Sequence, residues 1–246
     1  MIFIYRVTKA IIVAAGKGER LLPITGKIPK PLIEVNGKKI IESLIDAIVS
    51  NGIKEIYIVV GYLKEQFQYL KEKYDQIELI ENPYYAVCNN ISSLYMAREH
   101  LGNSIITDAD MIVNNQEIFN PQFEHSGYCS MWTEQHTNEW LQTVDENGFV
   151  VSCNRNGGKN GYQLFSVSFW TRRDGLKLRQ HLEEVFSGKK ITDIFWDDIP
   201  MFYYKDQYQL QIRKINEYDI IEIDSLAELI EEDATYIDVL SKTKPK

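Results

Sequence analysis

The chain has 246 residues, enough for one sizeable domain, and a formal net charge of −8 at pH 7. This acidic balance argues against a nucleic-acid partner, because proteins that hold nucleic-acid phosphates need clustered lysines and arginines. No apolar run is long enough to span a bilayer, so we expect no membrane partner either. The three cysteines form no Cys-x-x-Cys pair, which favours reduced thiols and a cytoplasmic location.

A glycine-rich turn follows the first apolar run of the chain. Residues 11–13 are β-branched, which predicts a buried parallel strand, and Ala14, Ala15, Gly16 and Gly18 come directly after it. Two glycines allow the backbone to turn sharply and to approach a bulky ligand. The exposed N–H groups of such a turn bind anions. We therefore expect this turn to hold a phosphate-bearing ligand.

Two cationic side chains follow the turn. Arg20 carries a planar guanidinium suited to bidentate phosphate contacts, and Lys30 lies between two prolines that restrict its backbone. The turn is not a Walker A loop, because no Gly-Lys-Ser/Thr follows it. It also departs from the dinucleotide fingerprint, because Leu21 occupies the place of the third glycine. The pattern predicts a phosphate site of another kind.

The first half of the chain alternates between strand and helix patterns. Apolar runs predict strands at 32–35, 56–60, 77–80 and 104–107, and helical spacing predicts helices at 41–49, 63–74 and 94–101. This alternation indicates an α/β fold with a Rossmann-like, mainly parallel sheet flanked by helices. Ligands of such sheets lie at the carboxyl ends of the strands, where the glycine turn begins.

A polar segment, residues 89–93, precedes the third of these helices. We expect one of its Asn or Ser side chains to cap the helix N-terminus. Amides and hydroxyls beside a nucleotide-binding turn can also contact the edge of a base as donors and acceptors. Asn90 and Ser93 are therefore candidates for contact with a nucleobase.

Two aspartates, Asp108 and Asp110, follow the strand expected at 104–107. Carboxylates at the end of a central strand need solvent, a partner or a cation. Mg²⁺ prefers oxygen ligands and is the expected occupant beside a triphosphate. Asp224 also lies between an expected strand and an expected helix, where capping the helix is the alternative to a metal.

The second half of the chain, from about residue 128, is richer in strands. Its patterns predict strands at 128–132, 140–144, 149–153, 162–170, 209–212 and 220–223, and helices at 176–186 and 225–232. No linker separates the halves, so we expect a single domain over 1–246, with a nucleotide-binding half at 8–127 and an acceptor-binding half at 128–235. Residues 241–246 are expected to form a flexible tail.

Aromatic side chains recur beside acidic ones in this half. A quaternary ammonium group donates no hydrogen bond, so aromatic faces and nearby carboxylates recognise it, each face contributing about 0.5–2 kcal/mol. A sugar would need many paired polar groups instead. We expect Trp132 and Trp170 to belong to the core. The candidate ammonium-binding residues are Trp140, Phe195, Trp196 and Asp197.

These motifs occur together in one known family. The chain carries, in order, Ala-Ala-Gly-x-Gly-x-Arg, Pro-Lys-Pro-Leu, Asn-Asn-x-x-Ser-Leu-Tyr, Asp-Ala-Asp, Thr-Asn-Glu-Trp, Phe-Trp-Asp-Asp and Glu-Ile-Asp-Ser. In this set it resembles bacterial CTP:phosphocholine cytidylyltransferases of the LicC type, within the sugar-nucleotidyltransferase-like superfamily. One departure is Phe195, where that family would have Tyr, but a phenyl ring keeps the aromatic face.

The resemblance implies CTP and phosphocholine as substrates and Mg²⁺ bound by Asp110 and Asp224. Arg20 would hold the β- and γ-phosphates, and Lys30 would neutralise charge around the α-phosphate. The alternatives are a sugar-1-phosphate nucleotidyltransferase, a cytidylyltransferase for phosphoethanolamine or an aminoalkylphosphonate, and a catalytically silent nucleotide-binding module. Sugar-1-phosphate nucleotidyltransferases share this glycine turn, so only the acceptor side distinguishes them from a phosphocholine enzyme.

Overall fold

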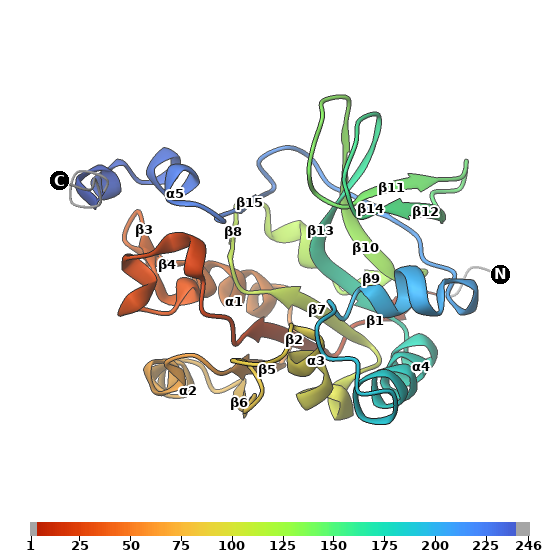
Figure 1. Ribbon diagram of the computed structural model, residues 1–246, viewed down its shortest axis with the longest axis horizontal. Helices are drawn as coiled ribbons and strands as arrows, with labels where there is room; N and C mark the ends of the chain where they lie inside the picture. The colour runs from red at the N-terminus through yellow and green to blue at the C-terminus, as the bar shows by residue number, and fades with distance from the viewer. Residues whose placement is uncertain (1–3, 240–246) are drawn as a thin grey trace.

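The computed structural model describes residues 4–239, so the tail expected at 241–246 lies outside the described residues. Parallel strands form the centre of the main sheet: β2 (Lys9–Ala14), β5 (Glu55–Val60), β6 (Ile77–Glu81) and β7 (Ser104–Asp108). They lie in the order β6-β5-β2-β7 (Figure 1). The expected α/β fold with a mainly parallel sheet is confirmed.

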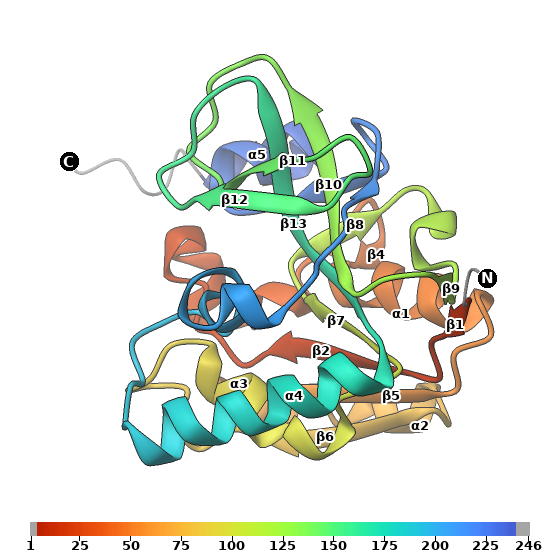
Figure 2. The same cartoon turned by 90° about the vertical axis from the view of Figure 1, so that its right-hand side faces the viewer.

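Helices cover both faces of this sheet, as its apolar parallel strands require. Ile12 of β2 belongs to a core shared with α1 (Ile40–Ser50) and α2 (Tyr69–Lys73). The preceding Ile11 belongs to a second core, shared with α3 (Ile91–Met96) and α4 (Arg172–Leu182), which lie side by side in Figure 2. Because successive side chains of a strand point to opposite faces, one short strand contributes to both cores.

The second half of the chain extends the sheet through β13 (Gly161–Trp170), which pairs antiparallel with β7. β13 also pairs with β10 (Gly127–Thr133) and β11 (Leu141–Val144), and β11 pairs with β12 (Val150–Asn154). β14 (Arg213–Lys214) joins the free side of β10. Figure 1 shows these strands projecting beyond the parallel ones. The long strand β13 therefore links the two halves of the chain in one sheet.

Short strand pairs fasten separate parts of the chain to one another. The pairing of β8 (Met111–Val113) with β15 (Ile220–Glu222) matters for the site, since it places the residues after 222 beside those before 111. The remaining elements are β1 (Tyr5–Arg6) paired with β9 (Gln122–Phe123), β3 (Glu34–Val35) with β4 (Lys38–Lys39), and α5 (Leu226–Glu232).

Two of the expected helices have different bounds. Residues 63–74 form a 3₁₀ turn, Lys64–Phe67, followed by α2. The buried Phe67 and Leu70 lie three residues apart, which is the period of the tighter helix. The helix expected at 94–101 begins earlier, because Ile91 is also buried, and after α3 the chain continues as a 3₁₀ turn at Arg98–His100.

Three further boundaries differ from expectation. The helix expected at 176–186 begins at Arg172, where the Thr171 hydroxyl caps α4, and continues as a π-helical turn at Glu183–Gly188. The strand expected at 32–35 is shortened to β3, because Lys30–Leu32, which contains Pro31, forms a 3₁₀ turn. The strand expected at 209–212 does not form: Gln211 makes only an isolated bridge with Phe149, and the strand β14 begins at Arg213. Within residues 4–239, no helix is long and apolar enough to cross a bilayer.

Gly127, at the start of β10, tests how closely this strand packs against the segment that precedes β14. A Cβ at Gly127 would lie 1.8 Å from the carbonyl oxygen of Gln211. We predict that Gly127→Ala lowers the free energy of unfolding by about 1–3 kcal/mol or more, because the backbone must shift to relieve the overlap. Urea unfolding followed by circular dichroism measures this. The control is Gly26→Ala, whose Cβ would meet only a Leu22 methyl group at 3.7 Å. Equal stabilities of the two variants would contradict the prediction.

Candidate active site

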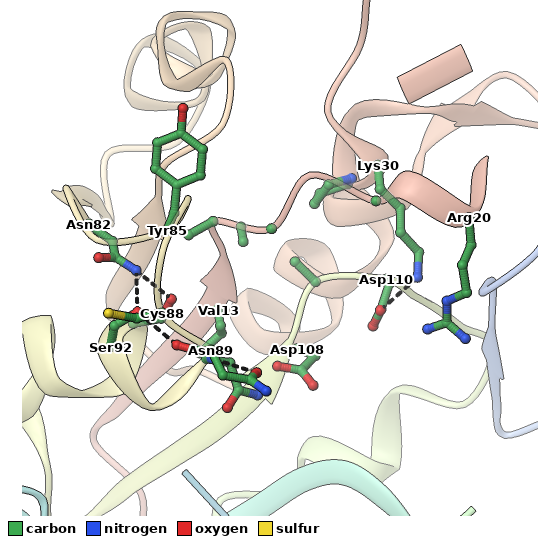
Figure 3. A pocket seen from close by; sticks show the side chains of 18 residues that line it. Val13, Arg20, Lys30, Asn82, Tyr85, Cys88, Asn89, Ser92, Asp108 and Asp110 are labelled. Carbon is green, nitrogen blue, oxygen red and sulfur yellow. Dashed lines mark hydrogen bonds and ion pairs between the residues drawn. The ribbon is translucent and has the colours of Figure 1, made fainter. Parts of the chain in front are cut away.

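The carboxyl ends of β2 and β7 border a cavity of about 300 Å³, which we call the glycine-loop pocket. In Figure 3 the side chains of Asn82 and Ser92 lie on one side of this pocket, Lys30 and Arg20 lie on the other, and Asp108 lies between them. The structure brings most of the sequence-predicted residues to its wall: Ala14, Ala15, Gly16, Gly18, Arg20, Lys30, Asn90, Ser93 and Asp110.

Gly18 allows the lysine to enter this pocket. Its φ of 63° lies in the left-handed region, and a Cβ there would lie 3.0 Å from Lys30 Cβ and 3.1 Å from Thr25 Cγ2. The Thr25 hydroxyl donates a hydrogen bond to the Gly18 carbonyl at 2.9 Å, which fixes the turn. The glycine therefore leaves room for the Lys30 side chain to pass across the turn.

Lys30 joins two aspartates that are far apart in the sequence. Its Nζ lies 2.8 Å from Asp110 Oδ2 and 2.8 Å from Asp224 Oδ1, and Arg20 pairs with the same Asp224 oxygen at 2.9 Å. Burial lowers the pKa of the Lys30 ammonium, but the charges and hydrogen bonds of the two carboxylates outweigh it, so the pKa lies above its ordinary value. Lys30 is therefore charged, while Arg20, with its side chain 72% exposed, faces the open side.

The pairing of β8 with β15 explains why Asp224 lies beside Asp110. The Ile223 N–H donates to the Asp110 carbonyl at 3.0 Å, and Ile223 itself is buried in a small core with Leu21 and Leu229. This core connects the residues after the glycine turn with α5. The predicted proximity of Asp110, Asp224 and the glycine turn is thereby confirmed.

Asp224 does not cap the helix that follows it. The Ser225 hydroxyl accepts the Glu228 N–H, and the Glu228 carboxylate accepts the Ser225 N–H in return, so these two residues form a capping box. The Asp224 carboxylate is left to interact with Lys30 and Arg20. The capping alternative is thus excluded for Asp224.

Glu222 is a functional candidate that the sequence reasoning missed. Ligand atoms of Asp110, Glu222 and Asp224 lie within 4.8 Å of one another, a spacing that allows them to share a cation. The second Asp110 oxygen, Oδ1, is buried without a hydrogen-bond partner, and burial together with Asp110 raises the pKa of Glu222 well above its ordinary value. A hard divalent cation would relieve both costs, so these residues fit one. The sequence offered one signal: Glu222 and Asp224 are two residues apart, and side chains at that spacing in a strand point to the same side.

A second cavity, of about 280 Å³, adjoins the first and we call it the aromatic pocket. The Trp140 and Phe195 rings meet there nearly at a right angle, with centroids 6.0 Å apart at 89°. Phe195 is 47% exposed. The carboxylates of Glu139 and Asp197 lie on the same wall. Glu139 was not singled out from the sequence, although it precedes Trp140 in a motif that was.

Trp196 does not line the aromatic pocket. It is 2% exposed and packs against Tyr128 and Trp170, with ring centroids 6.0 and 5.9 Å away. Adjacent residues of this turn face opposite ways, so Phe195 points outward and Trp196 inward. The expectation that Trp196 encloses an ammonium group is therefore wrong. Trp170 is buried as expected, whereas Trp132 is 50% exposed and does not belong to the core.

The carboxylates that follow Trp196 have different surroundings. Asp197 lines the aromatic pocket, its Oδ1 is buried without a hydrogen-bond partner, and burial with the nearby charge of Asp108 raises its pKa well above the ordinary value. Asp198 accepts the Phe195 N–H at 3.0 Å and pairs with Arg155. A cation bound in the pocket would lower this pKa again and favour the charged carboxylate, whereas Asp198 holds the turn that carries Phe195.

The polar segment before α3 forms its own network. The buried Asn82 amide donates to the Ser92 and Ser93 hydroxyls, at 3.0 Å each. Asn90 accepts the Trp196 N–H at 2.9 Å. No side-chain hydrogen bond caps α3, so the capping expected within 89–93 is wrong. Asn82 was missed because it lies seven residues before the segment that begins at Asn89, and only the folded chain brings it beside the two serines.

Comparison with known proteins identifies the group to which these features belong. The nucleotidyl transferase family matches residues 9–124. A 2-aminoethylphosphonate cytidylyltransferase of Lancefieldella rimae is 37% identical over 235 residues, covering 95% of this chain and 95% of that protein. A choline-phosphate cytidylyltransferase of Streptococcus pneumoniae is 38% identical over 218 residues, covering 89% of this chain and 93% of that protein. The chain is a LicC-type cytidylyltransferase of the nucleotidyl transferase family.

The structure of this cytidylyltransferase agrees with that assignment. The solved structure of the Streptococcus pneumoniae CTP:phosphocholine cytidylyltransferase, LicC, matches it with a TM-score of 0.85 and 36% identity, covering 97% of this chain and 100% of that one. The protein is therefore an enzyme that transfers a cytidylyl group, and the Rossmann-like fold expected from the strand pattern is the one observed.

The acidic cluster leads to a prediction about Mg²⁺ binding. Mg²⁺ should raise the unfolding temperature of the CTP-bound protein, because a ligand present at a hundred times its Kd stabilises the folded state by about 2.7 kcal/mol. Asp110→Asn should lose this Mg²⁺-dependent increase. Thermal unfolding measures it without turnover, because no acceptor is added. Glu217→Gln is the control, since it removes the same charge outside the cluster. An undiminished shift in Asp110→Asn would contradict the cation assignment.

Proposed function

We propose that the enzyme transfers the cytidylyl group of CTP to phosphocholine, giving CDP-choline and pyrophosphate, with Mg²⁺ bound by Asp110, Asp224 and Glu222. The observation that carries this proposal is the aromatic corner of Trp140 and Phe195, which adjoins the glycine-loop pocket and has carboxylates beside it. We also infer that residues 8–127 and 128–235 form the nucleotide and acceptor halves of one domain. The free thiols of Cys88, Cys129 and Cys153 suit a cytoplasmic enzyme.

On the nucleotide side, backbone N–H groups of Ala14 to Gly18 cradle the triphosphate. Arg20 binds the β- and γ-phosphates with its guanidinium fork. Lys30 neutralises the charge that develops around the α-phosphorus. The Ser93 hydroxyl, whose oxygen already accepts from Asn82, donates its hydrogen to the base edge. Asp110, Glu222 and Asp224 would hold Mg²⁺, which would supply positive charge to offset that of the phosphates.

The chemical step is an in-line displacement. An oxygen of the acceptor phosphate forms a bond to the α-phosphorus, the bond from that phosphorus to the β-phosphate oxygen breaks, and pyrophosphate leaves. Because the second pKa of a phosphate monoester is about 6, the attacking group is largely a dianion at neutral pH and needs no general base. Within residues 4–239, neither of the two pockets is lined by a histidine, which is consistent with this mechanism.

On the acceptor side, a trimethylammonium group fits the aromatic pocket. It carries no donor hydrogen, so the faces of Trp140 and Phe195 supply its attraction, together with the Asp197 carboxylate, whose ionised form the bound cation favours. A sugar fits less well, because it carries no positive charge to compensate the carboxylates that line this pocket. A silent binding module would need neither the acidic cluster nor its buried lysine.

2-Aminoethylphosphonate is a second candidate acceptor, favoured by a specific comparison. The Lancefieldella rimae relative named for that substrate matches over 95% of this chain. A primary ammonium group has three donor hydrogens, and the pocket offers Glu139 and Asp197 as acceptors. Phosphocholine would interact with the pocket through the ring faces, and 2-aminoethylphosphonate through hydrogen bonds to the carboxylates.

A pyrophosphate-release assay separates these functions. We expect CTP with phosphocholine to give the highest kcat/KM among acceptors that also include phosphoethanolamine, 2-aminoethylphosphonate and glucose-1-phosphate. UTP and dTTP with phosphocholine serve as controls for the nucleotide. A higher kcat/KM with 2-aminoethylphosphonate would replace phosphocholine as the acceptor, and turnover of glucose-1-phosphate alone would overturn both.

Removing the aromatic wall should act on the acceptor alone. Trp140→Ala is expected to raise the phosphocholine KM by roughly 2- to 30-fold, the equivalent of about 0.5–2 kcal/mol for one ring face. The CTP KM should stay within a factor of two, because Trp140 lies outside the glycine-loop pocket. Trp132→Ala is the control, since that exposed ring lines neither pocket. Equal increases in both KM values would show that Trp140 acts only through packing.

A further inference from the structure

The two pockets share a border of four residues. Arg20, Asn90, Asp108 and Asp110 line both of them. Since the cytidylyl group passes from a nucleotide in one pocket to an acceptor in the other, its α-phosphorus must lie at this border. Arg20 is a cation and the two aspartates are acids, so Asn90 is the only neutral polar side chain of the four.

The amide of Asn90 has a defined orientation. Its side chain faces the Trp196 N–H at 2.9 Å, and because a peptide N–H can only donate, the atom that meets it is the carbonyl oxygen Oδ1. The Nδ2 amine therefore points elsewhere. Within residues 4–239, Nδ2 donates to no protein acceptor. The side chain thus presents unused donor hydrogens at the border of the pockets.

The Asn90 backbone is held as firmly as its side chain. Its N–H donates to the Asn89 side chain at 2.7 Å, and its carbonyl accepts the Ser93 N–H at 2.9 Å in the first turn of α3. The neighbouring Asn89 N–H donates to the Thr192 carbonyl at 2.7 Å, a second bond between this segment and the turn that carries Phe195. Because the backbone and the side-chain oxygen of Asn90 are both held, its Nδ2 donor needs little reorganisation when charge develops beside it.

We propose that Asn90 is a catalytic residue whose Nδ2 donates a hydrogen bond to a nonbridging oxygen of the α-phosphoryl group during transfer, rather than to the nucleobase. No proton leaves Asn90 in this step; the bond made and the bond broken are the two at phosphorus described above. The donor stabilises the oxygen that gains charge beside the acidic side chains of Asp108 and Asp110. The proposal rests on cytidylyl transfer, but not on phosphocholine as the acceptor.

Asn90→Asp tests the donor separately from the anchor. Aspartate has the same shape and keeps an oxygen for the Trp196 N–H, but it loses the amine. We expect kcat to fall about 10²- to 10³-fold, as when a single oxyanion donor is removed. Asn90→Ala should lose a similar factor in kcat and also raise the acceptor KM, because the turn carrying Phe195 loses its anchor. If Asn90→Asp kept kcat within threefold while Asn90→Ala lost it, Asn90 would be only a positioning residue and the proposal would fail.

A thio-substituted nucleotide gives a readout that packing would not change. In the two diastereomers of CTP with sulfur on the α-phosphorus, one carries sulfur where Asn90 would donate, and sulfur is a poor acceptor. The wild-type enzyme should discriminate between them, and Asn90→Ala should reduce this discrimination about tenfold or more. Asn147→Ala is the control, since it removes an exposed amide that lines neither pocket, and it should keep the wild-type ratio. An unchanged ratio in Asn90→Ala would overturn the proposal.

The assays use whichever acceptor the wild-type enzyme turns over. A wild type that is inactive with phosphocholine but active with 2-aminoethylphosphonate would refute the acceptor proposal and leave the Asn90 test intact. An Asn90→Asp variant whose loss lies wholly in the CTP KM, with kcat retained, would instead assign Asn90 to ground-state nucleotide binding and refute the catalytic role.

Discussion

The ammonium of Lys30 is held between the carboxylates of Asp110 and Asp224, and the site depends on this contact. The lysine comes from the loop after the glycine turn, and Asp110 follows the central strand β7. Asp224 comes much later in the chain, after β15. Breaking such a buried pair by removing one partner leaves an uncompensated charge, which typically costs about 3–5 kcal/mol. The same three groups are the ones that a triphosphate and a divalent cation would engage. Substrate binding would therefore act on the same cluster that holds these segments together.

The geometry of the sheet explains why one enzyme can hold two substrates against each other. β7 is parallel to β2 on one side and antiparallel to β13 on the other. Its carboxyl end therefore lies near the glycine turn on one side and, through β13, near β11 and the preceding Trp140 on the other. Asp108 and Asp110 lie between the two cavities because they follow the strand shared by both halves. Two substrates bound on either side of this border would meet beside these two aspartates.

The acceptor side determines which cytidylyltransferase this is. Relatives of similar identity are named for phosphocholine and for 2-aminoethylphosphonate, and both substrates pair an ammonium group with a phosphorus oxyanion. The ring faces of Trp140 and Phe195 favour a methylated ammonium, whereas Glu139 and Asp197 suit donor hydrogens. Phe195 in place of the Tyr expected in the family keeps the ring face, so this departure by itself favours neither acceptor. The turn that carries Phe195 is tied through Asn90 to the nucleotide side, so the two halves of the site share one support.

The sequence by itself determined the parts of the protein that depend on neighbours along the chain. The β-branched run with its glycine turn, the cations Arg20 and Lys30, and Asp110 after a buried strand follow local rules of backbone freedom, charge and strand ends, and the order of the motifs indicated the family. Only the tertiary structure decided that Ser225 caps α5 and leaves Asp224 for the lysine, that Glu222 joins the acidic cluster, and that Asn82 supports Ser93. It also decided that Trp196 turns into the core while Phe195 faces the pocket. These outcomes depend on which side of a turn packs against a distant element, and sequence spacing carries no information about that distant surface.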